Sequence, residues 1–394
     1  MMGMLLFGVL LNLFSVALSS GLKLEQVLVL SRHNIRTPLT AKLEDTSPFK
    51  FPIWKNEVGH LTDKGALLET YMGGYFAEWL NKRGLLPPGC PTDENVFVYA
   101  NTRQRTRESA NAFVRGAFRN CNVSAHSIDS AEMDPVFNPI LRDTSDEVKR
   151  KIIAEMERKL MELQLQDAYL QLNEILDLKN SKICETESFC DLTDAKDEIV
   201  YVVGSEPNVV GPLAISNSVL DSFIMSYYEG MPDKDVAWGK IHNNEQWTLL
   251  SKIIRENQNV RFNSSVLARD VAKPLLKYIR GVFNGPLRPL TVLFGHDSNL
   301  NSIMAALGFK HYILPNQYEA TPPGGKIVFQ KWSDEDNSRE LLKIDYVYQT
   351  TDQIRNASKL SISNPPQWVQ LELRNCTVDK NGFCPWKKFL NILN

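Results

Sequence analysis

Three short apolar stretches of the chain each run directly into polar side chains. Residues 27–30, 96–100 and 290–294 are rich in valine, leucine and phenylalanine, and they predict buried β-strands because they are too short for helices. The polar segments that follow them are residues 31–38, 101–107 and 295–299. Near-continuous apolar strands are typical of a sheet covered on both faces, hence of an α/β fold. Ligands of such sheets bind beyond the carboxyl ends of the strands, so we expect the polar segments to converge on one site.

A different pattern covers residues 145–180, which are highly charged. Apolar side chains recur there at helical spacing, at Val148, Ile152, Met156, Leu160 and Leu163. This spacing predicts an amphipathic helix, and Ser145 with Glu147 close behind it is typical of a helix N-cap. The segment contains no strand-like run, so it indicates a helical region set within the α/β pattern.

The first twenty residues belong to a separate category. Residues 1–20 carry no charged side chain, and residues 4–18 are almost entirely apolar. The segment ends in small residues suited to a signal peptidase, so we predict a signal peptide over residues 1–20, with a buried N-terminal helix as the alternative. No later stretch is an unbroken apolar run of about 18 residues, and no transmembrane helix is expected.

The chain has six cysteines, and an even number in an exported protein predicts disulfides. Six cysteines allow fifteen connectivities. We favour pairing between sequence neighbours, which gives Cys90–Cys121, Cys184–Cys190 and Cys376–Cys384. A zinc site is the competing interpretation, but the sequence has no C-x-x-C motif and no histidine at ligand spacing beside a cysteine.

Composition narrows the class of protein. The 394 residues are 43% hydrophobic and 23% charged, which is ordinary for a folded globular protein. The length allows one large domain or two. A net charge of −2 argues against a strongly basic nucleic-acid binder, but it says nothing about a local basic patch. For the mature chain we expect neither a nucleic-acid nor a membrane partner, and no metal or other cofactor.

The polar segments after the predicted strands combine arginine, histidine and aspartate. Guanidinium groups present forked donors that match phosphate oxygens. Neighbouring positive charge lowers the pKa of a histidine and keeps it neutral and nucleophilic, while an aspartate can protonate a departing alcohol. Together they predict phosphoryl transfer through a phosphohistidine. Taken singly, each residue has a structural alternative: a surface ion pair for Arg32 or Arg36, a structural role for His33 or His296, and a helix N-cap for Asp297.

The pattern R-H-x-x-R-x-P at residues 32–38, with H-D at 296–297, resembles the histidine acid phosphatases, a branch of the histidine phosphatase superfamily. The chain departs from the family at Asn34, where most members carry glycine. This R-H-N form is similar to the bacterial periplasmic glucose-1-phosphatases. The resemblance covers essentially the whole mature chain through residues 71–73, 100–101, 134–139, 227–230, 236–239, 295–299 and 324–330.

The resemblance implies roles for individual residues. His33 would attack phosphorus, and Asp297 would protonate the leaving oxygen. The residues implied to hold the phosphoryl oxygens are Arg32, Arg36, Arg105 and His296. Arg105 is preferred over Arg103 and Arg107 because the family's third arginine precedes a threonine, as Arg105 precedes Thr106.

A further implied residue is Glu206, in the sequence S-E-P. It matches an acidic residue that lies over the pocket of glucose-1-phosphatases and helps to select the substrate. Without the resemblance, a solvated loop carboxylate is the more natural interpretation.

The implied fold is a three-layer α/β/α domain with a mixed, mostly parallel sheet and an inserted, mostly helical cap domain. We expect the α/β catalytic domain to comprise residues 21–140 and 263–394, and the cap to comprise residues 141–262. The charged helical pattern that begins at Ser145 supports the cap independently.

The function implied is that of an exported acid phosphomonoesterase that hydrolyses glucose 1-phosphate and related sugar phosphates. The alternative is a phytase, which would attack inositol hexakisphosphate by the same mechanism. A heavily charged substrate favours many basic groups at the pocket mouth, so the near-neutral charge and Glu206 favour the smaller substrate. A remote alternative is an inactive phosphate-binding protein, which the presence of His33 and Asp297 disfavours. The expected location is the periplasm, or the outside of the cell if the host is not Gram-negative.

Overall fold

A computed structural model describes residues 21–39, 41–86 and 88–393. The predicted signal peptide, residues 1–20, lies outside the described residues. The strands are β1 (Leu22–Arg32), β2 (Val96–Ala100), β3 (Ala125–His126), β4 (Glu198–Val200), β5 (Asn208–Val210), β6 (Leu290–Gly295), β7 (Lys326–Asp334), β8 (Arg339–Tyr348), β9 (Gln367–Gln370) and β10 (Cys384–Pro385).

The helices are as follows, with 3₁₀ helices labelled η: η1 (Ala41–Thr46), α1 (Asp63–Lys82), α2 (Gln104–Ala117), α3 (Asp146–Met161), α4 (Gln166–Leu176), η2 (Leu178–Asn180), α5 (Lys182–Glu187), α6 (Pro212–Glu229), η3 (Asp233–Asp235), η4 (Ala237–Gly239), α7 (Asn244–Phe262), α8 (Ser265–Val271), α9 (Lys273–Asn284), α10 (Asp297–Leu307), α11 (Thr351–Arg355) and α12 (Trp386–Leu393). In the described part of the chain, no helix is both long enough and apolar enough to span a bilayer.

The three predicted strands are β1, β6 and β2, and they lie side by side in the main sheet. The sheet order is β10-β8-β7-β1-β6-β2-β3, and β9 pairs with β8. Leu290 of β6 is opposite both Val27 of β1 and Val96 of β2, in parallel pairing on each side. Every residue of β6 is buried, as expected for a strand with helices on both faces. The carboxyl ends of these strands therefore meet at one edge of the sheet.

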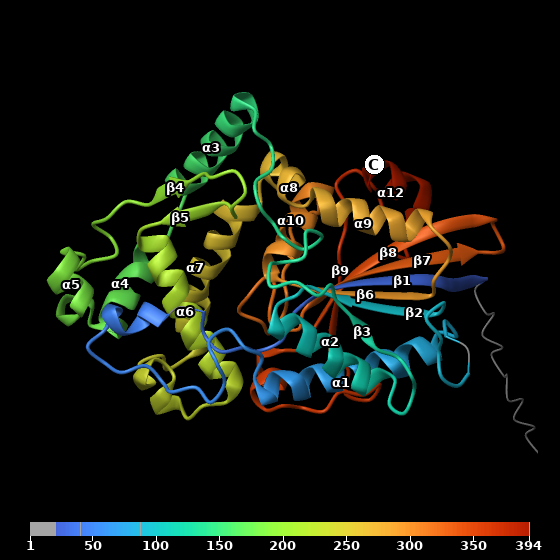
Figure 1. The fold of residues 1–394 in the computed structure, drawn as a ribbon, viewed down its shortest axis with the longest axis horizontal. Helices are drawn as coiled ribbons and strands as arrows, with labels where there is room; N and C mark the ends of the chain where they lie inside the picture. The colour runs from blue at the N-terminus through green and yellow to red at the C-terminus, as the bar shows by residue number, and fades with distance from the viewer. Residues whose placement is uncertain (1–20, 40, 87, 394) are drawn as a thin grey trace, which may run out of the picture.

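Helices cover both faces of this sheet (Figure 1). The helices α1 and α2 share one hydrophobic cluster with the sheet, which includes Phe76 and Phe113. The helices α8, α9, α10 and α12 share another on the opposite face, which includes Ile279 and Phe389. These layers confirm the predicted α/β fold. The sheet is less parallel than predicted, with three parallel and four antiparallel pairings among the described strands, because β7 and β8 form a long hairpin beside β1.

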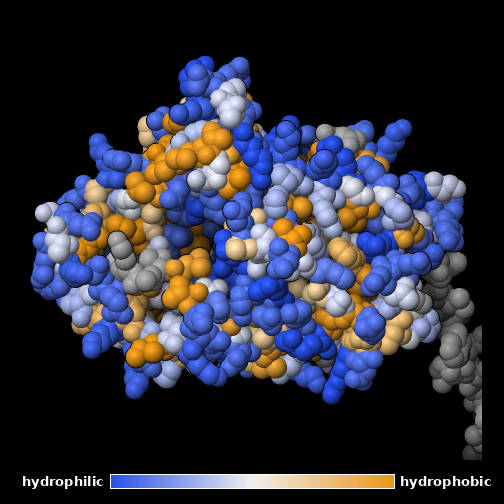
Figure 2. All heavy atoms as spheres, viewed as in Figure 1, coloured by the Kyte–Doolittle hydropathy of each residue, from blue (hydrophilic) through white to orange (hydrophobic). Residues whose placement is uncertain are grey.

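The helices α3 to α7 and the small hairpin β4–β5 lie together beside the sheet (Figure 1). The predicted amphipathic pattern forms α3, in which Ser145 caps the first turn by accepting from the backbone N–H of Val148. Ile152 and Met156 are fully buried in the cluster at the centre of these helices. That cluster also contains Phe51, which lies far upstream in the chain, so the boundaries expected at residues 141 and 262 stay a prediction. In Figure 2, apolar side chains gather on the outside of this unit over β4–β5.

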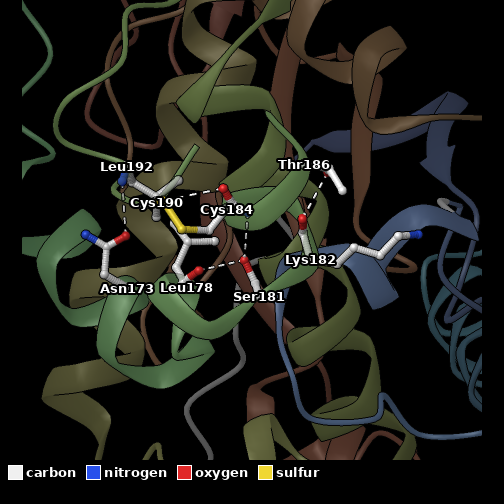
Figure 3. The surroundings of a disulfide bond; sticks show 8 residues. All are labelled: Asn173, Leu178, Ser181, Lys182, Cys184, Thr186, Cys190 and Leu192. Atoms are coloured by element: carbon white, nitrogen blue, oxygen red, sulfur yellow. Dashed lines mark hydrogen bonds between the residues drawn. A yellow bond between two sulfur atoms is a disulfide. The ribbon is translucent and has the colours of Figure 1, made fainter. Parts of the chain in front are cut away.

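Three disulfides tie the chain locally. They join Cys90 to Cys121, Cys184 to Cys190, and Cys376 to Cys384, which is the pairing of sequence neighbours. The middle disulfide closes the short helix α5 onto the loop that follows it. Figure 3 shows it beside Ser181, whose hydroxyl accepts from the Cys184 N–H and donates to the Leu178 carbonyl.

The disulfides differ in the length of chain they close. Cys90–Cys121 spans 31 positions, and loop-closure entropy predicts that replacing both cysteines by serine lowers the free energy of unfolding by about 3–4 kcal/mol. Cys184–Cys190 spans 6 positions, and the same substitution there is expected to cost about 2 kcal/mol. Urea denaturation of the two double variants measures both losses in the free energy of unfolding. A larger loss for the short loop would contradict this ranking.

Candidate active site

All seven residues singled out in the sequence line one cavity of about 270 Å³. The residues are Arg32, His33, Arg36, Arg105, Glu206, His296 and Asp297. The cavity lies where the strand ends meet the helical unit, and a recess is visible at this junction in Figure 2. The sequence therefore identified a set of side chains that the fold brings together, although they come from four separate parts of the chain.

Strand geometry positions the two histidines. The N–H of His33 donates to the Gly295 carbonyl at 3.0 Å, which continues the β1–β6 pairing one residue past the strand. His296 follows β6 immediately, and the imidazole centroids lie 5.5 Å apart. Both rings are almost fully buried, with 2% and 5% exposure.

The tautomer of His33 is fixed by its own chain. Its Nδ1 lies 2.8 Å from the Asn34 carbonyl oxygen, and a carbonyl only accepts, so Nδ1 carries the proton. The lone pair is then on Nε2. Burial lowers the pKa of His33 well below its ordinary value, and the charges of Arg105 and Arg32 lower it further. The low pKa favours the neutral imidazole of His33, with a free lone pair on Nε2.

Asn101 fixes the other histidine in the same Nδ1–H tautomer. Its Oδ1 accepts from the backbone N–H groups of Thr102 and Asp134, so its amide N–H₂ is turned toward Nε2 of His296, 2.7 Å away. Nε2 must then accept, and Nδ1 of His296 carries the proton. That N–H lies on the Arg105 side of the ring, with Nδ1 3.5 Å from Nη2 of Arg105. His296 therefore presents a donor where Arg105 also presents donors.

Arg32 is fully buried and is held by two acceptors. One guanidinium nitrogen donates to Glu319 at 2.9 Å and to the Thr321 carbonyl at 2.6 Å. The other terminal nitrogen lies 3.5 Å from Asp297. Burial raises the pKa of Glu319, while the adjacent Arg32 opposes that shift. The side chain of Arg32 is thus locked in one orientation, with Glu319 behind it and Asp297 beside it.

Arg36 is paired with a carboxylate of the helical unit. Its two terminal nitrogens donate to both oxygens of Asp221 on α6, at 2.8 and 2.9 Å. This planar, bidentate geometry is the strong form of an arginine–carboxylate pair. It connects the sheet end to the helices that cover the cavity.

Asp297 is the first residue of α10, with its carboxylate in the cavity. One oxygen accepts from the N–H of Ser298 at 2.9 Å, and the other from the amide of Gln258 at 3.3 Å. Burial alone would raise the pKa of Asp297, but the charges of Arg32 and Arg36 hold it below the ordinary value. The carboxyl group is ionised as long as those arginines keep their full charge.

Glu206 reaches the cavity from the loop between β4 and β5. It pairs with Arg261 of α7 at 3.2 Å, and Arg261 is held in turn by the Pro207 carbonyl at 2.8 Å. Burial raises the pKa of Glu206, against the effect of Arg261. Glu206 is therefore an anchored carboxylate at the cavity wall.

Asn34, the departure from the family motif, is built into the protein behind His33. Its amide donates to the fully buried Glu69 at 2.9 Å, and Glu69 pairs with the equally buried Lys326 at 2.6 Å. Gly324 faces Asn34 so closely that a Cβ there would lie 2.4 Å from the Asn34 amide nitrogen. Room for the larger side chain at position 34 thus depends on the glycine opposite.

Several residues that shape the cavity were missed in the sequence. Asp221 and Glu319 are the partners of the two motif arginines, and Gln258 and Arg261 contact Asp297 and Glu206. No sequence motif surrounds these positions. Each lies in a helix or loop, where the spacing of apolar residues predicts packing but not which charged groups pair. Nothing in the sequence around Lys326, the first residue of β7, indicated its buried ion pair with Glu69.

A family model for the histidine phosphatase superfamily (branch 2) matches residues 23–187 and 234–347. The chain belongs to this family. It is accordingly a phosphatase, and the cavity built from the family's R-H-x-x-R and H-D residues is its candidate active site.

The chain is similar to curated and solved members of this family. It is 44% identical over 384 residues to a glucose-1-phosphatase of Salmonella typhimurium, covering 95% of this chain and 92% of the relative. It is 30% identical over 399 residues to a phytase of Escherichia coli, covering 95% and 92%. It superposes with a TM-score of 0.86 on a Hafnia alvei phytase in complex with myo-inositol hexakis sulphate, at 28% identity and 95% and 97% coverage.

The Lys326–Glu69 pair behind His33 has no contact with solvent, so Lys326→Ala leaves a buried carboxylate without its cation. We expect the free energy of unfolding to fall by about 3–5 kcal/mol, measured by urea denaturation. The matched control is Lys151→Ala, which removes an exposed pair with Glu147 and should cost less than about 1 kcal/mol. Similar losses for both variants would refute the structural importance of the buried pair.

Proposed function

We propose that this protein is an exported phosphomonoesterase that hydrolyses glucose 1-phosphate and similar sugar phosphates through a phosphohistidine on His33. The observation that carries the substrate class is the charge balance of the cavity. Its lining contains four arginines and four carboxylates: Arg32, Arg36, Arg105 and Arg261 with Glu206, Asp221, Asp297 and Glu319. A substrate with one phosphate matches this balance, whereas a hexakisphosphate favours a large excess of positive charge.

The first chemical step follows from the tautomers of the two histidines. Nε2 of His33 forms a bond to phosphorus as the bond from phosphorus to the sugar oxygen breaks. Arg32, Arg36, Arg105 and the Nδ1–H of His296 supply donors for the phosphoryl oxygens. The buried Nε atoms of all three arginines have no hydrogen-bond partner within the described residues, which supports a site prepared for an oxyanion.

Asp297 supplies the proton for the leaving oxygen. Its pKa is held low by Arg32 and Arg36, and phosphoryl oxygens bound to those arginines offset their charge, so the pKa of Asp297 rises when substrate binds. The carboxyl group then donates to the departing sugar oxygen. In the second step water attacks phosphorus, its proton passes to the Asp297 carboxylate, and the bond to His33 breaks to release phosphate.

The relatives support the same substrate class. The glucose-1-phosphatase is 44% identical to this chain and the phytase 30%. The Glu206–Arg261 pair adds a fixed carboxylate at the cavity wall, where it can accept hydrogen bonds from sugar hydroxyls and repel additional phosphates. A cavity of about 270 Å³ also suits a small ligand.

Export is part of the proposal. It rests on the apolar, uncharged segment at residues 1–20 and on the three disulfides, which persist in oxidising compartments such as the periplasm.

The direct test is kcat/KM for glucose 1-phosphate against phytate, from mildly acidic to neutral pH, with His33→Ala as the blank. We expect a clear preference for glucose 1-phosphate and no labelled phosphoenzyme on acid quench of the variant. Faster hydrolysis of phytate would keep the mechanism and overturn the substrate. Full labelling of His33→Ala would refute the nucleophile, and turnover of neither compound would support a binding protein.

The role of Asp297 is tested by leaving groups of different basicity. Asp297→Asn should slow glucose 1-phosphate, whose alcohol needs a proton, far more than p-nitrophenyl phosphate, whose phenolate leaves unaided; the expected difference is on the order of 100-fold. Steady-state kcat for both substrates measures it. An equal loss would assign the proton to another group.

A further inference from the structure

A second hollow lies behind the wall of the candidate active site. It measures about 830 Å³ and lies between α7 of the helical unit and α10 of the sheet domain, closed by residues 309–320 and by Arg374. We call it the α7–α10 groove. Arg374 is fixed at the carboxyl end of α10, because its N–H donates to the Gly308 carbonyl at 2.9 Å. None of the predicted catalytic residues lines this groove.

The helix α7 forms a wall shared by the two hollows. Ile254, Gln258, Arg261 and Phe262 line the candidate active site. Lys252, Arg255, Glu256, Asn259 and Asn263 line the α7–α10 groove. Each set recurs at helical spacing, so the two sets occupy adjacent faces of the same helix. The groove is therefore a separate hollow and not an extension of the catalytic cavity.

Three cations without an ion-pair partner line the α7–α10 groove. Lys252, Arg255 and Arg374 line it, their side chains are exposed, and none makes an ion pair or side-chain hydrogen bond within the described part of the protein. Lys252 and Arg255 are one helical turn apart on α7, so they face the groove together.

Two of the three carboxylates that line the α7–α10 groove are paired with arginines. Glu319 pairs with Arg32, and Glu162 pairs with Arg158, which lies outside the groove lining. Glu256 accepts from the amide of Asn259 at 2.9 Å. Glu256 keeps its charge, but Lys252, Arg255 and Arg374 outnumber it, so the balance of these unpaired charges is positive.

The lining of the groove also contains side chains suited to an organic group. Tyr312, Ile313 and Tyr318 line it, and Ile313 is 72% exposed. The lining thus combines apolar and aromatic side chains with a few charged groups, as do many sites for small molecules.

We propose that the α7–α10 groove is a second binding site for a phosphate dianion, held by Lys252, Arg255 and Arg374. The anion is either free inorganic phosphate or the phosphate group of a sugar phosphate. This site goes beyond the catalytic function and does not depend on His33.

The wall between the two hollows connects the groove to the catalytic groups. Asn301 lines the groove, and its amide donates to the Asp297 carbonyl at 2.9 Å. Glu319 lines both hollows and holds Arg32. The lining of the groove thus contacts Asp297 through Asn301 and Arg32 through Glu319.

The test counts phosphate ions per chain by isothermal titration calorimetry at constant ionic strength. We expect two for the wild-type protein and one for Lys252→Ala/Arg255→Ala. The matched control, Lys387→Ala/Lys388→Ala, removes the same charge from two exposed positions of α12 and should keep both. Arg105→Ala, which weakens the catalytic site, should retain the groove ion.

A second arm identifies the source of the anion. Titration of glucose 1-phosphate into His33→Ala, with and without Lys252→Ala/Arg255→Ala, avoids turnover. If glucose 1-phosphate binds the groove more tightly than inorganic phosphate does, the groove is a site for a sugar phosphate. If the two ligands bind equally, the groove is a site for free phosphate.

One phosphate per wild-type chain, or an unchanged count in Lys252→Ala/Arg255→Ala, would overturn the proposal. Failure of the proposed function would show differently, as absence of turnover by the wild-type protein. Because alanine is a strong helix former and both positions are exposed, the double variant should fold normally, and its retained hydrolysis of p-nitrophenyl phosphate verifies this.

Discussion

The concentration of like charge around one histidine is the constraint on which the rest of the site depends. Bringing Arg32, Arg36 and Arg105 together favours phosphate and keeps His33 neutral, but the guanidinium groups also repel one another. Burial and the neighbouring Arg36 lower the pKa of Arg105 to about 10. The protein offsets this repulsion with Glu319 behind Arg32 and Asp221 across Arg36. Because Asp221 belongs to the helical unit, the same pair that balances the charge also joins the two parts of the molecule.

The sequence predicted the motif residues of this site but not the carboxylates that pair with its arginines. The apolar runs at β1, β6 and β2 were recognisable because strands buried on both faces leave a continuous pattern, and the motif around His33 follows the first of them. Asp221 and Glu319 leave no such pattern, since a single carboxylate in a helix or loop reads as a solvated side chain until its partner is known. The extent of antiparallel pairing was missed for a related reason. Strand direction depends on the connections between strands, and the apolar pattern of β7 and β8 does not indicate it.

The helix α7 illustrates how one element can serve two hollows. Its face toward the catalytic cavity carries Gln258 and Arg261, which hold Asp297 and Glu206. Its adjacent face carries Lys252 and Arg255, which pair with no carboxylate among the described residues. Because successive side chains point in different directions around a helix, α7 alone separates the catalytic cavity from the α7–α10 groove. A rigid wall of this kind keeps the catalytic groups at fixed distances while its other side stays open to solvent.

The order of strands has a consequence for how the protein is made. Residue 27 at the sheet centre pairs with residue 290 on one side and with residue 330 on the other, so β1 leaves the ribosome long before either of its partners. Contacts between such distant parts of a chain form slowly, because a long loop must close before they stabilise anything. The catalytic sheet therefore cannot assemble on a nascent chain that lacks its last third. Synthesis alone keeps the phosphatase inactive until the polypeptide is nearly complete, which gives any export or chaperone machinery time to act on an unfolded substrate.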